Sequence, residues 1–130
     1  MSVTINGDEV YEADEAFTVA LGTPTNATID VGTGLGTITN DDAVPTLSIG
    51  DITQAEGNAG STTFTFTVTK AGLTELAASV SFATADGTAV APGDYLSASN
   101  TLTFAPDVTS LPIAITVNGD TILEPDETFT

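Results

Sequence analysis

The stretch that decides the fold is residues 62–68, which read TTFTFTV. Its apolar residues Phe64, Phe66 and Val68 alternate strictly with threonines. Side chains of an extended chain point to opposite faces in turn, so strict alternation predicts a strand with one buried and one exposed face. We therefore expect a β-strand here, with the phenylalanines in a core and the threonines in water.

Similar patterns continue outward from this stretch. Six further stretches are expected to be strands: residues 79–84, 101–104, 111–117 and 17–21, the segment around Leu47 and Ile49, and the segment around Ile38. Gly, Pro, Asp and Asn clusters separate them, and no stretch shows a convincing helical period. Seven short strands with regular turns predict an all-β fold, an immunoglobulin-like seven-stranded antiparallel sandwich.

The charge balance excludes several classes of function. The chain has 130 residues with 18 Asp and Glu against one basic residue, Lys70, and no His, for a net charge of −17. Such a chain cannot neutralise nucleic-acid phosphates, and anionic membrane surfaces repel it. No apolar run reaches the length that spans a bilayer, about 18 residues, so we expect no membrane insertion.

The residue types also argue against an enzyme. Without His or Cys, the chain has no imidazole base and no thiolate nucleophile. Two carboxylates could in principle act as a glycosidase pair. However, there is no Trp, and the six Phe mostly fit strand-core positions, so no aromatic-lined cleft is expected. The prediction is that the protein is not an enzyme.

An internal repeat organises the chain. Residues 3–18 read VTINGDEVYEADEAFT and residues 115–130 read ITVNGDTILEPDETFT, with nine of sixteen positions identical at an offset of 112. The chain therefore contains one repeat unit of 112 residues and 18 more. A unit begins naturally near Pro45, after the turn-like residues 40–42. We expect residues 1–42 to be the second half of one unit and residues 43–130 the first part of the next.

Carboxylates gather in the same loop of both copies. Several like charges in one loop repel each other unless something neutralises them, at a cost of up to about 4 kcal/mol per close pair. Calcium is the best-fitting counter-ion, because it accepts 6–8 oxygen ligands in flexible geometry. The alternative is that these loops are simply solvated surface that serves solubility.

The chain resembles the Calx-beta domain in three segments. These are FATADGTAVAPGDY at residues 82–95, TLTFAPDVTSLPIAITVNGDTILEPDETF at 101–129, and EAFTVALGTPTNATI with GTGLGTITNDD between residues 15 and 42. The resemblance implies a seven-stranded sandwich of immunoglobulin type. Such domains are cytosolic calcium sensors in animal sodium–calcium exchangers. In bacteria they recur in long extracellular, adhesin-like proteins.

The resemblance also implies a set of calcium ligands at one pole of the sandwich. In the second unit they are Glu56, Asp94, Asp120, the Ile122 carbonyl, Glu124 and Glu127. In the leading half-unit they are Asp8, the Val10 carbonyl, Glu12 and Glu15, with Asp41 and Asp42 after the last strand. Asn40 and Gly119 (like Gly7) stand where the family has acids, which implies fewer ions or weaker binding.

Two functions from different classes remain open. The first is a calcium-binding structural repeat of a large extracellular or cell-surface bacterial protein, in which calcium rigidifies the junction between modules. The second is a metal-free spacer, or an adhesive module that binds a protein or glycan through its loops. The expected partners are calcium, and neighbouring repeats or other copies of the chain in a head-to-tail assembly.

The repeat-offset order predicts how such an assembly forms. A strand of eight residues is about 26 Å long, whereas the linker of residues 40–45 reaches at most about 20 Å. Completion of residues 43–130 by the chain's own residues 1–42 is therefore strained. We expect residues 1–42 of one molecule to complete the sandwich of another, although residues 3–18 then duplicate residues 115–130.

Overall fold

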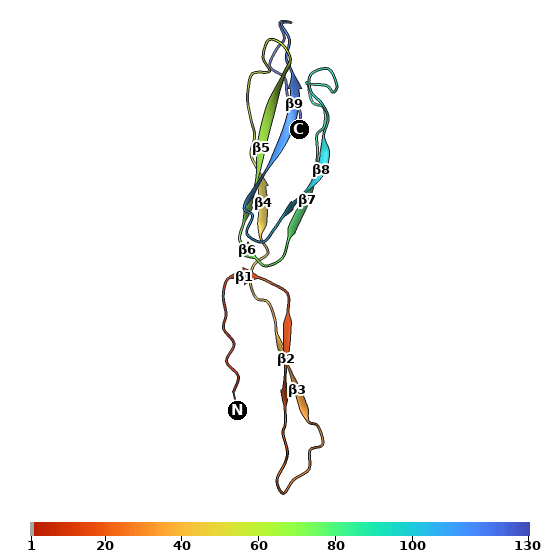
Figure 1. Cartoon of the computed structure of the whole chain (residues 1–130). Coiled ribbons are helices and arrows are strands. Elements are labelled where there is room, and N and C mark those ends of the chain that lie inside the picture. Colours follow the sequence, from red (N-terminus) through yellow and green to blue (C-terminus); the bar gives the residue numbers. More distant parts are fainter. Residues whose placement is uncertain (1) are drawn as a thin grey trace.

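The computed structural model describes residues 2–130, and within them the chain is all-β, with nine strands and no helix (Figure 1). The strands are β1 Val10–Tyr11, β2 Glu15–Ala20, β3 Thr33–Ile38, β4 Thr46–Ile49, β5 Ser61–Ala71, β6 Leu73–Thr74, β7 Ala78–Ala83, β8 Ser99–Phe104 and β9 Ser110–Asn118. Residues 2–130 include no helix of the length and apolar character that crossing a membrane requires.

Two antiparallel sheets form the body of the molecule. One has the order β4-β5-β9, and the other pairs β7 with β8. Their facing residues build the core, since Phe64 and Ile115 from the first sheet and Phe104 from the second are buried. The threonines that alternate with Phe64, Phe66 and Val68 along β5 are exposed, as the sequence pattern predicts.

The long connection between β7 and β8 closes one end of this core. Tyr95 is only 1% exposed, and its hydroxyl donates to Asp86 Oδ1 at 2.7 Å. Phe129 stacks on the Tyr95 ring at 4.4 Å between centroids. Residue Phe129 also pairs with Asp86 in an isolated antiparallel bridge. The segment after β9 is thus fixed against the loop that follows β7.

The first part of the chain stands apart from the body. Strands β2 and β3 form an antiparallel hairpin that pairs with no other strand in the described chain. Figure 1 shows this hairpin extending away from the two-sheet body, so that the molecule is elongated. The short strand β1 pairs in parallel with β6, which links the two parts.

The structure confirms the all-β class and each expected strand. The seven strands of four or more residues are β2, β3, β4, β5, β7, β8 and β9. Within one chain, however, five of them lie in the two-sheet body and two in the separate hairpin. The reason is the order of the repeat, because the hairpin precedes the body in sequence and a short linker joins them. The boundary between residues 42 and 43 stays a prediction.

Candidate metal site

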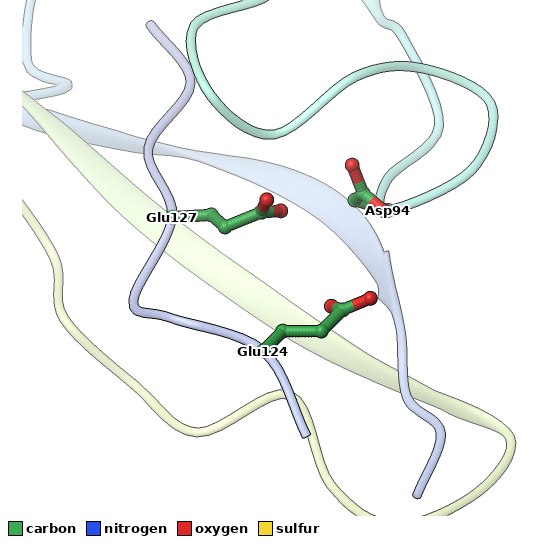
Figure 2. A group of neighbouring side chains, drawn as sticks. All are labelled: Asp94, Glu124 and Glu127. Atoms are coloured by element: carbon green, nitrogen blue, oxygen red, sulfur yellow. The ribbon is translucent and has the colours of Figure 1, made fainter. Parts of the chain in front are cut away.

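Acidic loops lie together at the end of the body that is closed by the long connection between β7 and β8. We call this set the acidic pole: Glu56, Asp94, Asp120, Glu124 and Glu127. Within the described residues, one group of carboxylates has oxygens that all lie within 4.8 Å of one another: Asp94, Glu124 and Glu127. Figure 2 shows Glu124 and Glu127 extending from the segment after β9 toward Asp94 in the β7–β8 connection.

Hydrogen bonds from Asn118, a residue of the repeat motif, hold Asp94 in place. The Asn118 amide donates to the carbonyls of Pro92 at 2.9 Å and Gly93 at 2.7 Å, and its backbone N–H donates to the Asp94 carbonyl at 2.8 Å. The Asp94 Oδ2 accepts the N–H of Val90 at 2.7 Å. The end of β9 therefore fixes the turn that carries Asp94.

The segment around Glu127 is fixed by hydrogen bonds to the connection between β7 and β8. The Thr128 N–H donates to Thr88 Oγ1 at 2.8 Å, and the Thr128 carbonyl accepts the N–H of Ala89 at 3.0 Å. Earlier in the same loop, Asp120 Oδ1 accepts the N–H of Ile122 at 2.7 Å. This bond shapes the turn in which the predicted Ile122 carbonyl ligand lies.

The electrostatics of the acidic pole favour neutralisation. Partial desolvation and like charges raise the pKa of Glu124. The like charges, from the largest effect to the smallest, belong to Asp120, Glu127, Asp94 and Glu56. The raised pKa means that the charged form of the Glu124 carboxylate is destabilised relative to its protonated form.

Glu127 shows the same effect. Desolvation raises its pKa first, followed by the charge of Asp94 and a hydrogen bond with Asp94 that forms when one carboxyl is protonated, and then Glu56. Lys70 does not relieve the repulsion. Its side chain is buried, and its ammonium group donates hydrogen bonds to the carbonyls of Ala105 and Pro106.

Gly119 lies close to the backbone of the loop that carries Glu56. A Cβ on Gly119 would lie 2.7 Å from the Gly57 carbonyl oxygen and 2.9 Å from that of Glu56. No side chain fits there without a shift of the backbone. At Gly7, the equivalent position of the first copy, a Cβ would meet nothing within 4 Å.

A second acidic group lies where the hairpin meets the body. We call it the junction acids: Asp8, Glu12, Glu15, Asp41, Asp42 and Glu75. Desolvation and then like charges raise the pKa of Glu12, the latter in the order Glu75, Asp8, Glu15 and Asp42. Desolvation also raises the pKa of Asp42, followed by the charges of Asp41, Asp8 and Glu9. The negative charge of Glu75, a residue of the following unit, therefore repels the acids in the leading copy of the loop.

Asn40 organises the junction acids through hydrogen bonds. Its Oδ1 accepts the N–H of Glu12 at 3.0 Å, and its Nδ2 donates to the Asp42 carbonyl at 3.1 Å. Its backbone N–H donates to Asp14 Oδ1 at 2.8 Å. An aspartate could not supply the Nδ2 donor, so an asparagine is better suited to this position than the acid of the family pattern.

The acidic pole fits the chemistry of calcium. Two oxygens on opposite sides of one Ca²⁺, each about 2.4 Å away, are about 4.8 Å apart, which is the limit within which the Asp94, Glu124 and Glu127 oxygens lie. Hard carboxylate oxygens from flexible loops are the donors that Ca²⁺ takes. Without His or Cys in the chain, the donor set does not suit zinc.

Comparison with protein families agrees with this architecture. The Calx-beta domain model matches residues 1–47 and, in a second match, residues 40–130. The chain belongs to the Calx-beta domain family. Calx-beta domains are β-sandwich modules associated with calcium binding, and they are structural or binding domains rather than enzymes. No curated protein and no solved structure matches the chain.

The Calx-beta ligand positions separate into two groups in space. The structure brings Asp94, Glu124 and Glu127 together, and places the charges of Glu56 and Asp120 beside them. It gathers Asp8, Glu12, Glu15 and Asp42 around the junction, with Asp41 next to Asp42. Val10 pairs with Leu73, at the strand link between the two parts. The assignment of all these residues as ligands stays a prediction.

Two residues that shape these Calx-beta loops were not among the predicted ligands. Asn118 positions Asp94, and its identity with Asn6 in the repeat was the available signal. Glu75 joins the junction acids because its N–H donates to the Tyr11 carbonyl at 3.1 Å beside the β1–β6 pair. Nothing in the local sequence around Glu75 indicates this pairing, which joins residues more than sixty positions apart.

Proposed function

We propose that this chain is a calcium-binding structural repeat of a large adhesin-like protein, located outside the cell or at the cell surface of a bacterium. Calcium bound at the acid loops rigidifies the module and its junction with the next. Its macromolecular partners are neighbouring repeats or other copies of the chain, joined head to tail.

The observation that carries this proposal is the convergence of Asp94, Glu124 and Glu127, whose carboxylate oxygens lie within 4.8 Å of one another. The three come from two separate loops, so the folded chain gathers them and an unfolded chain does not. A ligand that binds only the folded state stabilises it, by about 2.7 kcal/mol when its concentration is 100 times Kd. Calcium bound at the acidic pole therefore stabilises the folded module.

The test is a thermal melt of the whole chain in chelator and then in about 1 mM Ca²⁺, a level suited to extracellular modules. Magnesium at equal ionic strength is the control, because Mg²⁺ demands rigid octahedral geometry. We expect a rise in Tm of several degrees with calcium only. An unchanged Tm, or equal rises with both ions, would mean that the acids are solvated charge and that the chain is a metal-free spacer.

A matched pair of variants locates the effect. Asp94→Asn removes one charge from the acidic pole while it keeps an oxygen that can accept the Val90 N–H. Asp107→Asn removes the same charge from an exposed turn between β8 and β9. Asp94→Asn should lose most of the calcium-dependent rise in Tm, and Asp107→Asn should keep it. Equal behaviour of the two variants would contradict a site at the pole.

A further inference from the structure

Among residues 2–130, β7 has a neighbouring strand on one edge only, and its outer edge is open. On its inner edge, β7 pairs with β8, and just beyond its end the Thr84 N–H donates to the Ala98 carbonyl. The backbone groups of the next residue, Ala85, point to the opposite edge, where they exchange both hydrogen bonds with Thr130. Because these directions alternate along an antiparallel strand, the backbone groups of Ser79, Ser81 and Ala83 face the open edge.

The core is only partly covered on this side. Phe66, Val80, Phe82 and Leu102 pack against the buried cluster but remain half-buried. The whole chain exposes 9362 Å². A compact chain of this mass exposes about 6,400 Å², so roughly 3,000 Å² more than usual is in water. That excess is larger than the surface that a stable interface buries, about 1,200–2,000 Å² in total.

The repeat identifies what fits this edge. Phe129 already lies just beyond the end of β7, stacked on Tyr95 and bridged to Asp86. At the offset of 112, residues 127–130 correspond to Glu15–Thr18, with three of four residues identical. These four residues begin β2. The β2–β3 hairpin is therefore the continuation that the repeat specifies after Phe129.

The hairpin has a suitable apolar face. Phe17, Val19 and Leu21 lie on one side, and the residues opposite Phe17 and Val19 in β3 are Gly36 and Gly34. Leu21 is 62% exposed. In the isolated hairpin, the Phe17 ring lies over Gly36, whereas its counterpart Phe129 packs among Phe64, Phe66 and Tyr95.

We propose that the β2–β3 hairpin of one copy of this chain pairs with the open edge of β7 in a second copy, and that repetition of this contact builds a head-to-tail chain. The register follows from the Phe129–Asp86 bridge. Phe17 takes the place opposite Asp86, which sets Ala20 opposite Ala83 and Leu21 opposite Phe82. The apolar face of the hairpin then lies on the same side as Phe82, toward the core.

The exchange replaces residues 127–130 with nearly identical residues and adds new pairing beyond them. The incoming Val19 and Leu21 reach along β7, whereas residues 127–130 bond only to the segment after β7, at Ala85, Asp86, Thr88 and Ala89. A hairpin of the same molecule is poorly placed for this role, because it extends away from its own body (Figure 1). This inference rests on the proposed head-to-tail repeat, and it makes Glu15 of the incoming hairpin the substitute for Glu127 at the acidic pole.

Cysteine cross-linking tests the register, since the chain has no Cys of its own. One full-length variant carries Ala20→Cys and a second carries Ala83→Cys, and the two are mixed under mild oxidation. Both side chains are exposed. A hydrogen-bonded antiparallel pair has a Cα separation of about 5.5 Å, which suits a disulfide. The matched control replaces Ala83→Cys with Ser79→Cys, four residues along the same exposed face of β7.

We expect about tenfold more mixed dimer from the first pair than from the control, because the control positions lie too far apart for a disulfide. Equal yields from the two pairs, or no mixed dimer, would overturn the proposal. Sedimentation of the cysteine-free chain gives a second readout. Wild type should assemble as its concentration rises, and Leu21→Asp should remain monomeric.

The control for Leu21→Asp is Leu35→Asp. Leu35 is 74% exposed and lies opposite Thr18, on the other face of the hairpin, so this variant should still assemble. Loss of assembly in both variants, or monomeric wild type at high micromolar concentration, would contradict the exchange. Both experiments are run in chelator and in Ca²⁺. A mixed dimer without a calcium-specific rise in Tm would refute only the calcium function, and the rise without the mixed dimer would refute only the hairpin exchange.

Discussion

Residues 3–18 and residues 115–130 share nine of sixteen positions, but they lie in different surroundings. In the second copy, Phe129 stacks on the buried Tyr95, and Glu124 and Glu127 converge on Asp94. In the first copy, Phe17 lies over Gly36 of a lone hairpin, and Glu12 faces Glu75 across the β1–β6 link. The local turn is the same, since Asp8 and Asp120 each accept the N–H two residues later.

The difference shows which structural features a repeated motif determines by itself. The motif reproduces its own turn and its own acids, because these depend on neighbours within a few residues. It does not reproduce the core contact of Phe129 or the convergence of Glu124 and Glu127 on Asp94, because these need a body on which the motif can fold. Matched substitutions at equivalent positions of the two copies measure this difference directly.

The largest contrast is expected between Phe129→Ala and Phe17→Ala. Loss of a phenylalanine ring from a packed core costs about 3 to 5 kcal/mol. Phe129 contacts three other aromatic rings but is only half-buried, so we expect a loss near the lower end of this range. Phe17→Ala removes a ring that only covers its own hairpin. Urea unfolding at a concentration where the chain is monomeric should show the loss for Phe129→Ala alone. Equal losses would mean that the hairpin docks on the body of its own chain.

The second contrast is between Gly119→Ala and Gly7→Ala. The new methyl group at Gly119 would meet the Gly57 and Glu56 carbonyls, and such overpacking costs about 1 to 3 kcal/mol. At Gly7 the methyl group meets nothing within 4 Å. Gly7→Ala should therefore be neutral or stabilise by up to about 1 kcal/mol, since it restricts the unfolded chain. Urea midpoints of both variants, measured in chelator, check this prediction, and a stable Gly119→Ala protein would argue against the close approach.

The third contrast concerns calcium. Glu124→Ala removes a carboxylate from the converging group, whereas Glu12→Ala removes the equivalent residue of the first copy. At a calcium concentration of one to ten times Kd, the ion contributes roughly 0.4 to 1.4 kcal/mol. We expect Glu124→Ala to remove most of the calcium-dependent rise in Tm, and Glu12→Ala to leave most of it. The opposite ranking would place the stabilising ion at the junction acids.

The smallest expected effect is a pH dependence at Asp86. Hydrogen bonds from the Tyr95 hydroxyl, and then from the Ala91 N–H, lower the pKa of Asp86 below its ordinary value of 3.8. A carboxylate with a lowered pKa stabilises the folded state above the ordinary value, and this contribution is lost as pH falls through the folded-state pKa. Asp86 lies in the connection between β7 and β8, so the effect belongs to the body.

Asp86→Asn provides the comparison, because asparagine keeps the accepting oxygen but does not titrate. As pH falls from 5 through 3.8 and lower, the Tm of wild type should fall more steeply than the Tm of this variant. The measurement is a series of melts in chelator. Parallel pH profiles for the two proteins would show that the hydrogen bonds to Asp86 do not favour its charged form.

The strands could be predicted from the sequence to a large extent. The alternation around Phe64 and Phe66 predicts β5, and the same logic predicts the other long strands, because side-chain direction depends only on the extended backbone. The sequence also predicts that Asp94, Glu124 and Glu127 belong together, but only through resemblance to a family. Neither Asn118 as the support of Asp94 nor Glu75 as a member of the junction acids could be predicted in this way. Both depend on hydrogen bonds between residues distant in sequence.

The sequence by itself determined the all-β class, the strong negative charge and the duplicated acidic motif, since composition and residue spacing are local properties. Only the tertiary structure decided which copy of the motif brings two carboxylates within 4.8 Å of Asp94 and which phenylalanine packs against the core. It also decided that Gly119 cannot carry a side chain whereas Gly7 can. The physical reason is that convergence, burial and steric exclusion depend on the partners a residue meets in space, and the two copies meet different partners.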